Sequence, residues 1–262
     1  MTASSAPCTM TEALDGLLEK YGVRPVIGWR LLSAFEAVAG DDWLLAPATT
    51  IESDEPCDRV VPLLPWRAER RFVELKRLVD EKTVVPLVMG RLARFTDGGE
   101  SALPHELYRM LDLCEWLAGD RIVTVFATIT QGGCANVLCR LADGVVTSIE
   151  VSGTLPAGSE PIDRHELIAR RGVACDRVVD TQVPQSSVYL LADGGAKTYT
   201  DTDAELIGLP SEQVFLVRAA YRVLSEPELA EQWRNRHRRL RGLVRLAINS
   251  DRRRQRLAVE GA

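Results

Sequence analysis

The chain has 262 residues, of which 46% are hydrophobic and 26% charged, a balance typical of a globular protein with a substantial apolar core. Its net charge is −5 and its isoelectric point about 5.4. This acidic balance argues against a general nucleic-acid binder, because such proteins need a basic surface. No apolar run reaches the roughly 18 residues that a membrane span requires, and residues 1–10 lack the pattern of a secretory signal. We therefore expect a cytoplasmic protein without a membrane partner.

The cysteines do not form a metal-binding pattern. Their spacing is irregular, no Cys-x-x-Cys occurs, and only three histidines could join them as ligands. Several of them stand in apolar patterns, where a free thiol is usually a small core residue. We therefore expect no metal site from the six cysteines Cys8, Cys57, Cys114, Cys134, Cys139 and Cys175.

The first 66 residues contain short helical and extended patterns. A helix is predicted over Thr9–Lys20, where Thr9 and Glu12 have the spacing of a capping box. Three further elements are predicted, a helix at Trp29–Ala39 and apolar strands at Trp43–Ile51 and Arg59–Leu64.

The next section alternates helices with a strand. Apolar residues at helical spacing predict an amphipathic helix over Ala68–Lys82, followed by a strand at Val84–Phe95. A Gly-Gly turn at Gly98 then leads into a helix over Pro104–Leu117. Gly119 follows, and glycine is the usual residue at the C-terminal end of a helix.

After Gly119 the pattern changes to successive strands, which predicts an antiparallel sheet rather than alternating strands and helices. Asp143-Gly144 and Asp193-Gly194-Gly195 are typical of turns between antiparallel strands. The predicted strands are Arg121–Thr130, Cys134–Ala142, Val145–Thr154, His165–Arg170, Val173–Val179 and Ser186–Leu191. Two helices, Ser211–Leu224 and Glu228–Asn249, and a short segment at Leu257–Val259 close the chain.

This order of elements resembles the Gfo/Idh/MocA family of NAD(P)-dependent sugar and inositol oxidoreductases, from about residue 59 to 259. The resemblance is carried by Trp66-Arg67 with Phe72–Val79, Gly98-Gly99 with Leu111–Gly119, Val145–Ser152, Glu166–Gly172, and Leu243–Ser250 with Arg252–Val259. It implies an α+β fold. We expect a large, mainly antiparallel, open-faced sheet flanked by helices at 67–262, preceded by a short truncated α/β segment at 1–66.

The sequence departs from the family where the nicotinamide cofactor would bind. No G-x-G-x-x-G is present, although a dinucleotide-binding unit uses such a turn to bring pyrophosphate to a helix N-terminus. About 60 residues precede Trp66, roughly half of what a fold of two βαβαβ halves needs. The family's Glu-Lys-Pro turn also has no counterpart. We therefore expect a chain without a cofactor.

The family's catalytic helix differs as well. When the helix after Gly99 is aligned on Asp112, the position of the family's catalytic His falls on Arg109. The Asp usually found four residues earlier falls on His105. A guanidinium stays protonated and cannot accept the alcohol proton released during hydride transfer. Hydride chemistry of the family type is therefore not expected.

Several polar residues could still line the old substrate cleft and bind a polar or anionic small molecule. His105 would act there as the acid or base. The competing interpretation is that Arg109 and Asp112 form a surface ion pair and that His105 only starts the helix. The candidate binding residues beside His105 are Arg67, Arg91, Arg94, Arg109 and Asp112.

Arginine is concentrated between Arg234 and Arg256. This segment could bind phosphate or nucleic acid. However, Leu240, Leu243 and Ala247 form an apolar stripe, which favours a packed helix with a solvated basic face. We therefore expect no nucleic-acid partner.

Two functional hypotheses follow. The first is a nicotinamide-free relative of the sugar dehydrogenases that acts as a non-oxidoreductase partner, either as a homodimer through its sheet face or with a catalytic partner protein. The alternative is a cofactor-independent isomerase, lyase or cyclase acting on a polar small molecule in specialised metabolism. Redox chemistry with a cofactor supplied by another chain is the least favoured, because Arg109 replaces the proton acceptor.

Overall fold

The computed structural model describes residues 9–176, 187–192, 195–200 and 208–259. The chain divides into two compact units, Met1–Glu69 with Asp201–Arg239, and Arg70–Thr200 with Leu240–Ala262. The division expected at residue 66 lies close to the end of the first segment. The return of the chain to the first unit after residue 200 was not expected from the sequence.

The first unit contains a small parallel sheet and two helices that contact each other. The sheet has the order β1-β2-β3, formed by Trp29–Leu31, Trp43–Pro47 and Val60–Leu63. The 3-10 helices η1 (Ala48–Thr50) and η2 (Pro65–Ala68) follow β2 and β3. Helix α1 (Met10–Lys20) packs against α5 (Ser211–Ser225).

The capping box of α1 is confirmed. The Glu12 backbone N–H donates to the Thr9 hydroxyl at 3.2 Å, and the Thr9 backbone N–H donates to the Glu12 carboxylate at 2.8 Å. Two backbone donors that the first turn would leave without helical partners are thereby satisfied.

The helix predicted over Trp29–Ala39 is wrong. Residues 29–31 form strand β1 instead, and Leu32 continues the pairing by donating to the Leu45 carbonyl. The residues that suggested a helical spacing, Leu32, Phe35 and Val38, pack on the core formed by β2 and β3 in irregular backbone. Pairing with a buried neighbouring strand therefore overrode a short helical pattern.

In the second unit, α2 (Arg70–Asp80) and α3 (Gly99–Ala118) contact one face of a nine-stranded sheet within the described residues. The sheet order is β11-β10-β9-β8-β4-β7-β6-β5-β12, and all pairs are antiparallel except β4 with β7. The strands are β4 (Leu87–Phe95), β5 (Ile122–Ile129), β6 (Cys134–Leu141), β7 (Val146–Ser152), β8 (Ile162–Ala169), β9 (Gly172–Cys175), β10 (Ser187–Ala192), β11 (Gly195–Thr200) and β12 (Leu257–Ala258).

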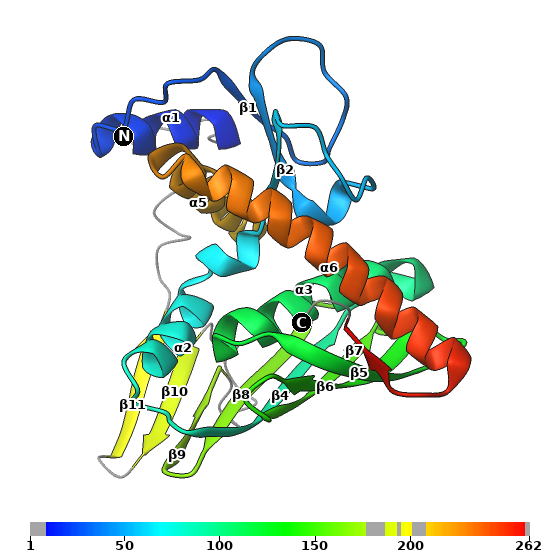
Figure 1. The fold of residues 1–262 in the computed structure, drawn as a ribbon. Coiled ribbons are helices and arrows are strands. Elements are labelled where there is room, and N and C mark those ends of the chain that lie inside the picture. The colour runs from blue at the N-terminus through cyan, green and yellow to red at the C-terminus, as the bar shows by residue number, and fades with distance from the viewer. Residues whose placement is uncertain (1–8, 177–186, 193–194, 201–207, 260–262) are drawn as a thin grey trace. The chain divides into compact units, whose positions relative to one another are not determined.

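No described helix covers the other face of this sheet, which we call the open face (Figure 1). The predicted α+β fold with an open-faced, mainly antiparallel sheet is confirmed. Strand β11 was not expected, and residues 193–194 of the turn predicted before it lie outside the described residues.

Helix ends and edges in this unit have clear local causes. Gly119 ends α3 in the left-handed conformation at φ 71°, as predicted. Helix α3 starts at Gly99, five residues before the predicted Pro104, because Gly99 already donates its N–H to the Gly153 carbonyl at 2.9 Å. Near its end, α6 (Glu228–Arg253) supplies Ser250 and Asp251, which accept N–H groups of β5.

None of the described helices has the length and apolarity needed to cross a membrane.

The contact between Gly153 and Gly99 gives a stability prediction. A Cβ added at Gly153 would lie 2.0 Å from the Gly99 carbonyl oxygen, whereas one added at Gly242 in α6 would meet nothing within 4 Å. We expect Gly153→Ala to lower the free energy of unfolding by several kcal/mol, and Gly242→Ala to raise it by about 0.8 kcal/mol. Chemical denaturation measures both, and equal effects would contradict the assigned packing.

Candidate functional site

The structure separates the residues that the sequence grouped into one cleft. Within the second unit, Arg94 and Arg109 come together around a shared carboxylate. Arg91 is exposed on the open face, where its guanidinium lies 3.8 Å from the Glu166 carboxylate. His105 is exposed on α3.

The two remaining candidates do not join this pair in the described contacts. Asp112 is completely buried, so it is not the exposed partner in a surface ion pair with Arg109. Arg67 belongs to the first unit, in η2. The site is therefore built around Arg94 and Arg109 with residues that the sequence did not indicate.

Strand alternation explains why Arg94 and Arg91 lie on opposite faces. Successive side chains of β4 point to opposite sides, so Leu92 and Arg94 face the helices and Arg91 faces away. The register of β4 with β8 pairs Leu92 with His165 and Arg94 with Asp163. The same alternation therefore places Asp163 and His165 under the helices beside Arg94.

Three guanidiniums from three elements converge on the Asp163 carboxylate. Arg71 from α2 lies 2.6 Å from Oδ2, Arg94 from β4 lies 2.8 Å from Oδ1, and Arg109 from α3 lies 3.8 Å from Oδ2. The Asp163 side chain is only 10% exposed and the arginines 9–15%. These pairs are therefore largely shielded from water and are less screened than surface ion pairs.

Two further carboxylates complete this group, which we call the arginine cluster. Glu106 from α3 accepts from Arg94 Nε at 2.7 Å, and Asp176, just after β9, lies 3.3 Å from Arg71. Among the described contacts, three arginines are thus balanced by three carboxylates. Because the opposite charges balance, the free-energy cost of removing these ions from water is partly offset.

A histidine and aspartate pair lies beneath the cluster. His165 and Asp176 are both fully buried, and Asp176 accepts from the His165 backbone N–H at 2.6 Å and pairs with Nδ1 of its ring. The other ring nitrogen, Nε2, is buried and has no hydrogen-bond partner among the described residues. The Phe72 ring packs edge-to-face on the imidazole at 4.6 Å, and the Arg71 guanidinium lies over Phe72 at 4.5 Å.

The surrounding charges determine the ionisation of both aspartates. Burial by itself would raise the pKa of Asp163, but the three guanidiniums outweigh it and hold that pKa well below its usual range. Burial would also raise the pKa of Asp176, but its charge interaction and hydrogen bonds with His165, together with Arg71, lower it. Both carboxylates are therefore anionic at neutral pH.

This arrangement can hold negative charge, and Arg109 cannot accept a proton in it. The residue that stands where the resemblance places a catalytic base is ion-paired with Asp163. The sequence analysis missed Arg71, Glu106, Asp163, His165 and Asp176. A partial signal existed, since Asp163 and His165 are alternate residues near a predicted strand, but nothing in the sequence paired them with Arg94.

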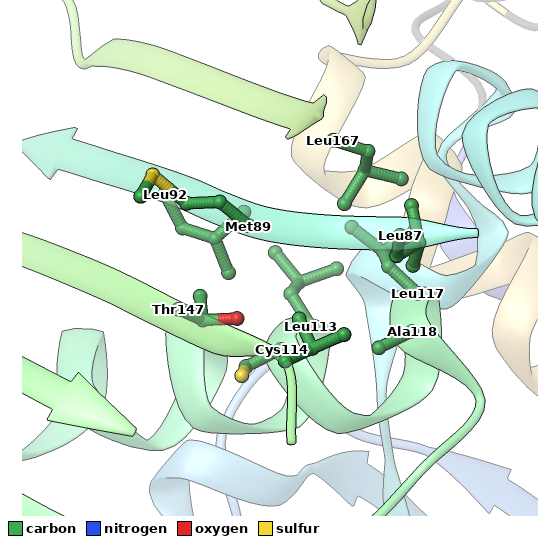
Figure 2. Close-up of a pocket in the computed structure, with 11 residues that line it drawn as sticks. Leu87, Met89, Leu92, Leu113, Cys114, Leu117, Ala118, Thr147 and Leu167 are labelled. Carbon is green, nitrogen blue, oxygen red and sulfur yellow. The ribbon is translucent and has the colours of Figure 1, made fainter. Parts of the chain in front are cut away.

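The pocket between α3 and the sheet is apolar and small (Figure 2). It is lined by side chains such as Leu92, Leu113, Leu117 and Leu167, with Cys114 and Thr147 beside them. Its volume of about 10 Å³ holds no more than one water-sized molecule. A sugar-sized substrate does not fit in it, and none of the sequence-predicted binding residues lines it.

The described residues of the first unit do not fit a nicotinamide dinucleotide. Such cofactors place their pyrophosphate at the N-terminus of a helix that follows a parallel strand through a tight glycine-rich turn. Here β1 leads into irregular backbone, and β2 and β3 lead into 3-10 helices of three and four residues. Among the described residues, no group of three or more His, Cys, Asp or Glu side chains is placed to hold a metal.

No family profile and no curated protein matches this chain, but solved structures share its fold. Levoglucosan dehydrogenase in complex with NADH and L-sorbose is 13% identical, with a TM-score of 0.67 over 84% of this chain and 74% of that one. An oxidoreductase from Agrobacterium radiobacter in complex with NAD+, L-tartaric acid and magnesium is 13% identical, with a TM-score of 0.60 over 76% of this chain and 64% of that one.

An oxidoreductase domain protein from Kribbella flavida is similar at 12% identity, with a TM-score of 0.60 over 76% of this chain and 66% of that one. The chain thus spans slightly less than two thirds of the length of the Agrobacterium and Kribbella proteins. These neighbours are Gfo/Idh/MocA-type oxidoreductases. The resemblance inferred from the sequence is therefore confirmed at the level of the fold.

Replacing the central carboxylate should damage the cluster. We expect Asp163→Asn to lower the free energy of unfolding by about 3–5 kcal/mol, because three buried guanidiniums would lose their shared counter-charge. Urea denaturation measures this loss. The matched control Asp80→Asn removes an exposed carboxylate of α2 and should cost less than about 1 kcal/mol.

The same variant tests the pH dependence. Because the pKa of Asp163 is lower in the folded chain than in the unfolded chain, its stabilisation is complete above the unfolded value of about 3.9 and is lost as the pH falls below it. Wild-type protein should therefore lose stability more steeply than Asp163→Asn below about pH 4. Parallel pH profiles would show that Asp163 is not held anionic by the cluster.

Proposed function

We propose that this chain is a nicotinamide-independent relative of the sugar dehydrogenases that acts as a non-oxidoreductase subunit. It pairs through the open face of its sheet, either with a second copy or with a catalytic partner protein. The observation that carries the proposal is two pairs of exposed apolar side chains on neighbouring strands of that face.

These four side chains, which we call the open-face stripe, lie on four neighbouring strands in two adjacent rows, because the register places Ser148 opposite Leu138 and Arg140 opposite Val146. The stripe consists of Phe126 on β5, Leu138 on β6, Val146 on β7 and Met89 on β4, which are 38–43% exposed. The register pairs Phe126 with Leu138 and Val146 with Met89, so the side chains of each pair stand together on one face. Contiguous exposed apolar side chains on a sheet are typical of a protein contact surface.

The arginine cluster supports the part of this proposal that assigns no hydride transfer to the chain. Arg109 stands at the position of the expected proton acceptor and is ion-paired with Asp163, and the described strand connections of the first unit do not fit the dinucleotide. A subunit that binds a partner needs neither feature. A two-fold interface requires only one self-complementary patch, which the open face could supply.

The proposal predicts that a charge in the stripe weakens assembly. Where the partner is a second copy, we expect Leu138→Glu to shift the mass measured by light scattering from a dimer toward a monomer, by at least tenfold in the dissociation constant, because a buried unpaired carboxylate disfavours the interface. Val73→Glu, which alters an apolar side chain of α2 that is 40% exposed, should leave the mass unchanged.

A second measurement addresses the cofactor. Titration with NADH and NADPH by calorimetry should give no binding at micromolar concentrations. Micromolar binding of either nucleotide would contradict the proposal and indicate a dehydrogenase. A wild-type monomer that also pairs with no other protein would contradict the role of the open face.

The His165–Asp176 pair favours a second candidate, acid–base catalysis on a polar small molecule without a cofactor. A buried aspartate that holds Nδ1 of a histidine fixes the ring orientation and leaves Nε2 to exchange a proton, as in hydrolase triads. His165 would then replace the exposed His105 as the acid or base. Nε2 is covered by its neighbours, so a substrate would have to displace the Phe72 side chain to reach it.

Deuterium exchange tests this candidate. We expect wild-type protein in D2O to exchange the carbon-bound hydrogens beside the carbonyl of L-sorbose, measured by proton NMR, and His165→Asn to lose at least a hundredfold in rate. The asparagine amide can still donate to Asp176 but has no atom at the Nε2 position. His105→Asn is the matched control and should retain the rate. No exchange by wild-type protein beyond the buffer rate would exclude this chemistry on L-sorbose.

A further inference from the structure

Four arginines at the end of α6 are exposed and unpaired within the described part of the chain. We call them the arginine rim: Arg252, Arg253, Arg254 and Arg256. No described carboxylate lies within 4 Å of their guanidiniums, and no side-chain hydrogen bond engages them. Four like charges within five residues repel one another, and no described carboxylate pairs with them.

Arginines earlier in the same helix, unlike those of the rim, contact other residues of the chain. In the first unit, the Arg238 guanidinium lies 3.5 Å from the Glu55 carboxylate, and Arg234 donates to the Asp58 carbonyl at 2.7 Å. His237 between them contacts the Ser53 carbonyl at 2.9 Å. The chain thus covers this part of α6 with its own acidic turn at residues 52–58, whereas the rim has no such cover.

Helix-end electrostatics account for only part of the rim. Cations in the last turn interact favourably with the helix dipole, which explains Arg252 and Arg253. Arg254 and Arg256 lie beyond the helix end. Arg254 has φ 51°, a left-handed conformation that glycine adopts more easily, so the turn holds this arginine in a backbone conformation unusual for its residue type.

The turn that carries the rim is held in place by hydrogen bonds. Arg254 donates its N–H to the Asp251 carbonyl at 3.0 Å, and Gln255 donates to the Ser250 carbonyl at 3.2 Å. The Ser250 hydroxyl contacts the Gln255 carbonyl at 2.7 Å. The four guanidiniums are therefore presented from an ordered backbone, which reduces the entropy lost on binding.

The rim adjoins the open-face stripe. Arg256 directly precedes Leu257, whose register partner in β5 is Val125, next to Phe126 of the stripe. The rim therefore lies beside the β5 end of the stripe, and the rest of the stripe extends over β6, β7 and β4 of the same unit. A protein that contacts the stripe can reach the rim without a separate site.

We propose that the arginine rim binds an acidic peptide segment of a different protein that docks on the open face. This inference rests on the proposed function and specifies the partner's chemistry. A second copy fits less well, because in the exposed acidic turn at residues 52–58 the Glu55 carboxylate already lies 3.5 Å from Arg238 and the Asp58 backbone carbonyl accepts from Arg234. A protein segment fits better than nucleic acid, because the adjoining surface is apolar and the chain carries a net charge of −5.

Fluorescein-labelled hexaglutamate tests the rim on the full chain by fluorescence anisotropy. At about 20 mM salt, where charge screening is weak, we expect binding that Arg252→Gln/Arg253→Gln weakens about tenfold. The matched control is Arg170→Gln/Arg171→Gln, two adjacent exposed arginines in the β8–β9 turn, which should leave binding unchanged. Circular dichroism of each variant confirms that it is folded.

Three outcomes would overturn the inference. These are no binding of hexaglutamate, an equal loss in both arginine pairs, or tighter binding of a short single-stranded oligonucleotide or of phosphatidylserine vesicles than of hexaglutamate. Leu138→Glu separates this inference from the proposed function, because it should retain hexaglutamate binding. If Leu138→Glu leaves assembly intact while hexaglutamate still binds, the proposed role of the stripe in assembly is contradicted. The proposal that the rim binds acidic peptides is then still supported.

Discussion

The structure of the second unit depends on one carboxylate, that of Asp163, lying among three guanidiniums. Burying an arginine is costly unless its charge is neutralised close by. Arg71, Arg94 and Arg109 come from α2, β4 and α3, so their common partner on β8 ties both helices to the sheet. The low pKa of Asp163 is the electrostatic consequence of this arrangement.

The same constraint limits the chemistry that the α3 face can perform. A guanidinium cannot accept a proton, and the Arg109 guanidinium on this face is engaged in an ion pair with Asp163. His165 retains an imidazole nitrogen without a partner among the described residues, but Phe72 and Arg71 lie above it. The fold of an oxidoreductase therefore carries a helix face suited to holding charge, while the exposed apolar side chains gather on the opposite face.

Sequence reasoning succeeded where a pattern was long and its period clear, and failed where it was short. The strands from residue 122 to 152 and the stop of α3 at Gly119 follow directly from local signals. The helix predicted over residues 29–39 rested on a short pattern, and pairing with β2 decided the structure of residues 29–31. The cleft predicted around His105 and Arg91 failed for a related reason, since family alignment places residues on elements but does not specify which side chains face each other.

The sequence by itself determined the class of the fold, the order of its elements and the presence of an arginine at position 109, because periodicity, glycine turns and residue identity are local properties. Only the tertiary structure decided that Arg94 and Arg71 meet Asp163, partners 69 and 92 residues away along the chain. Strand alternation fixes which residues share a face, but the order of β8, β4 and β7 in the sheet sets which of them become neighbours. The three guanidiniums then keep Asp163 anionic, although burial alone would raise its pKa.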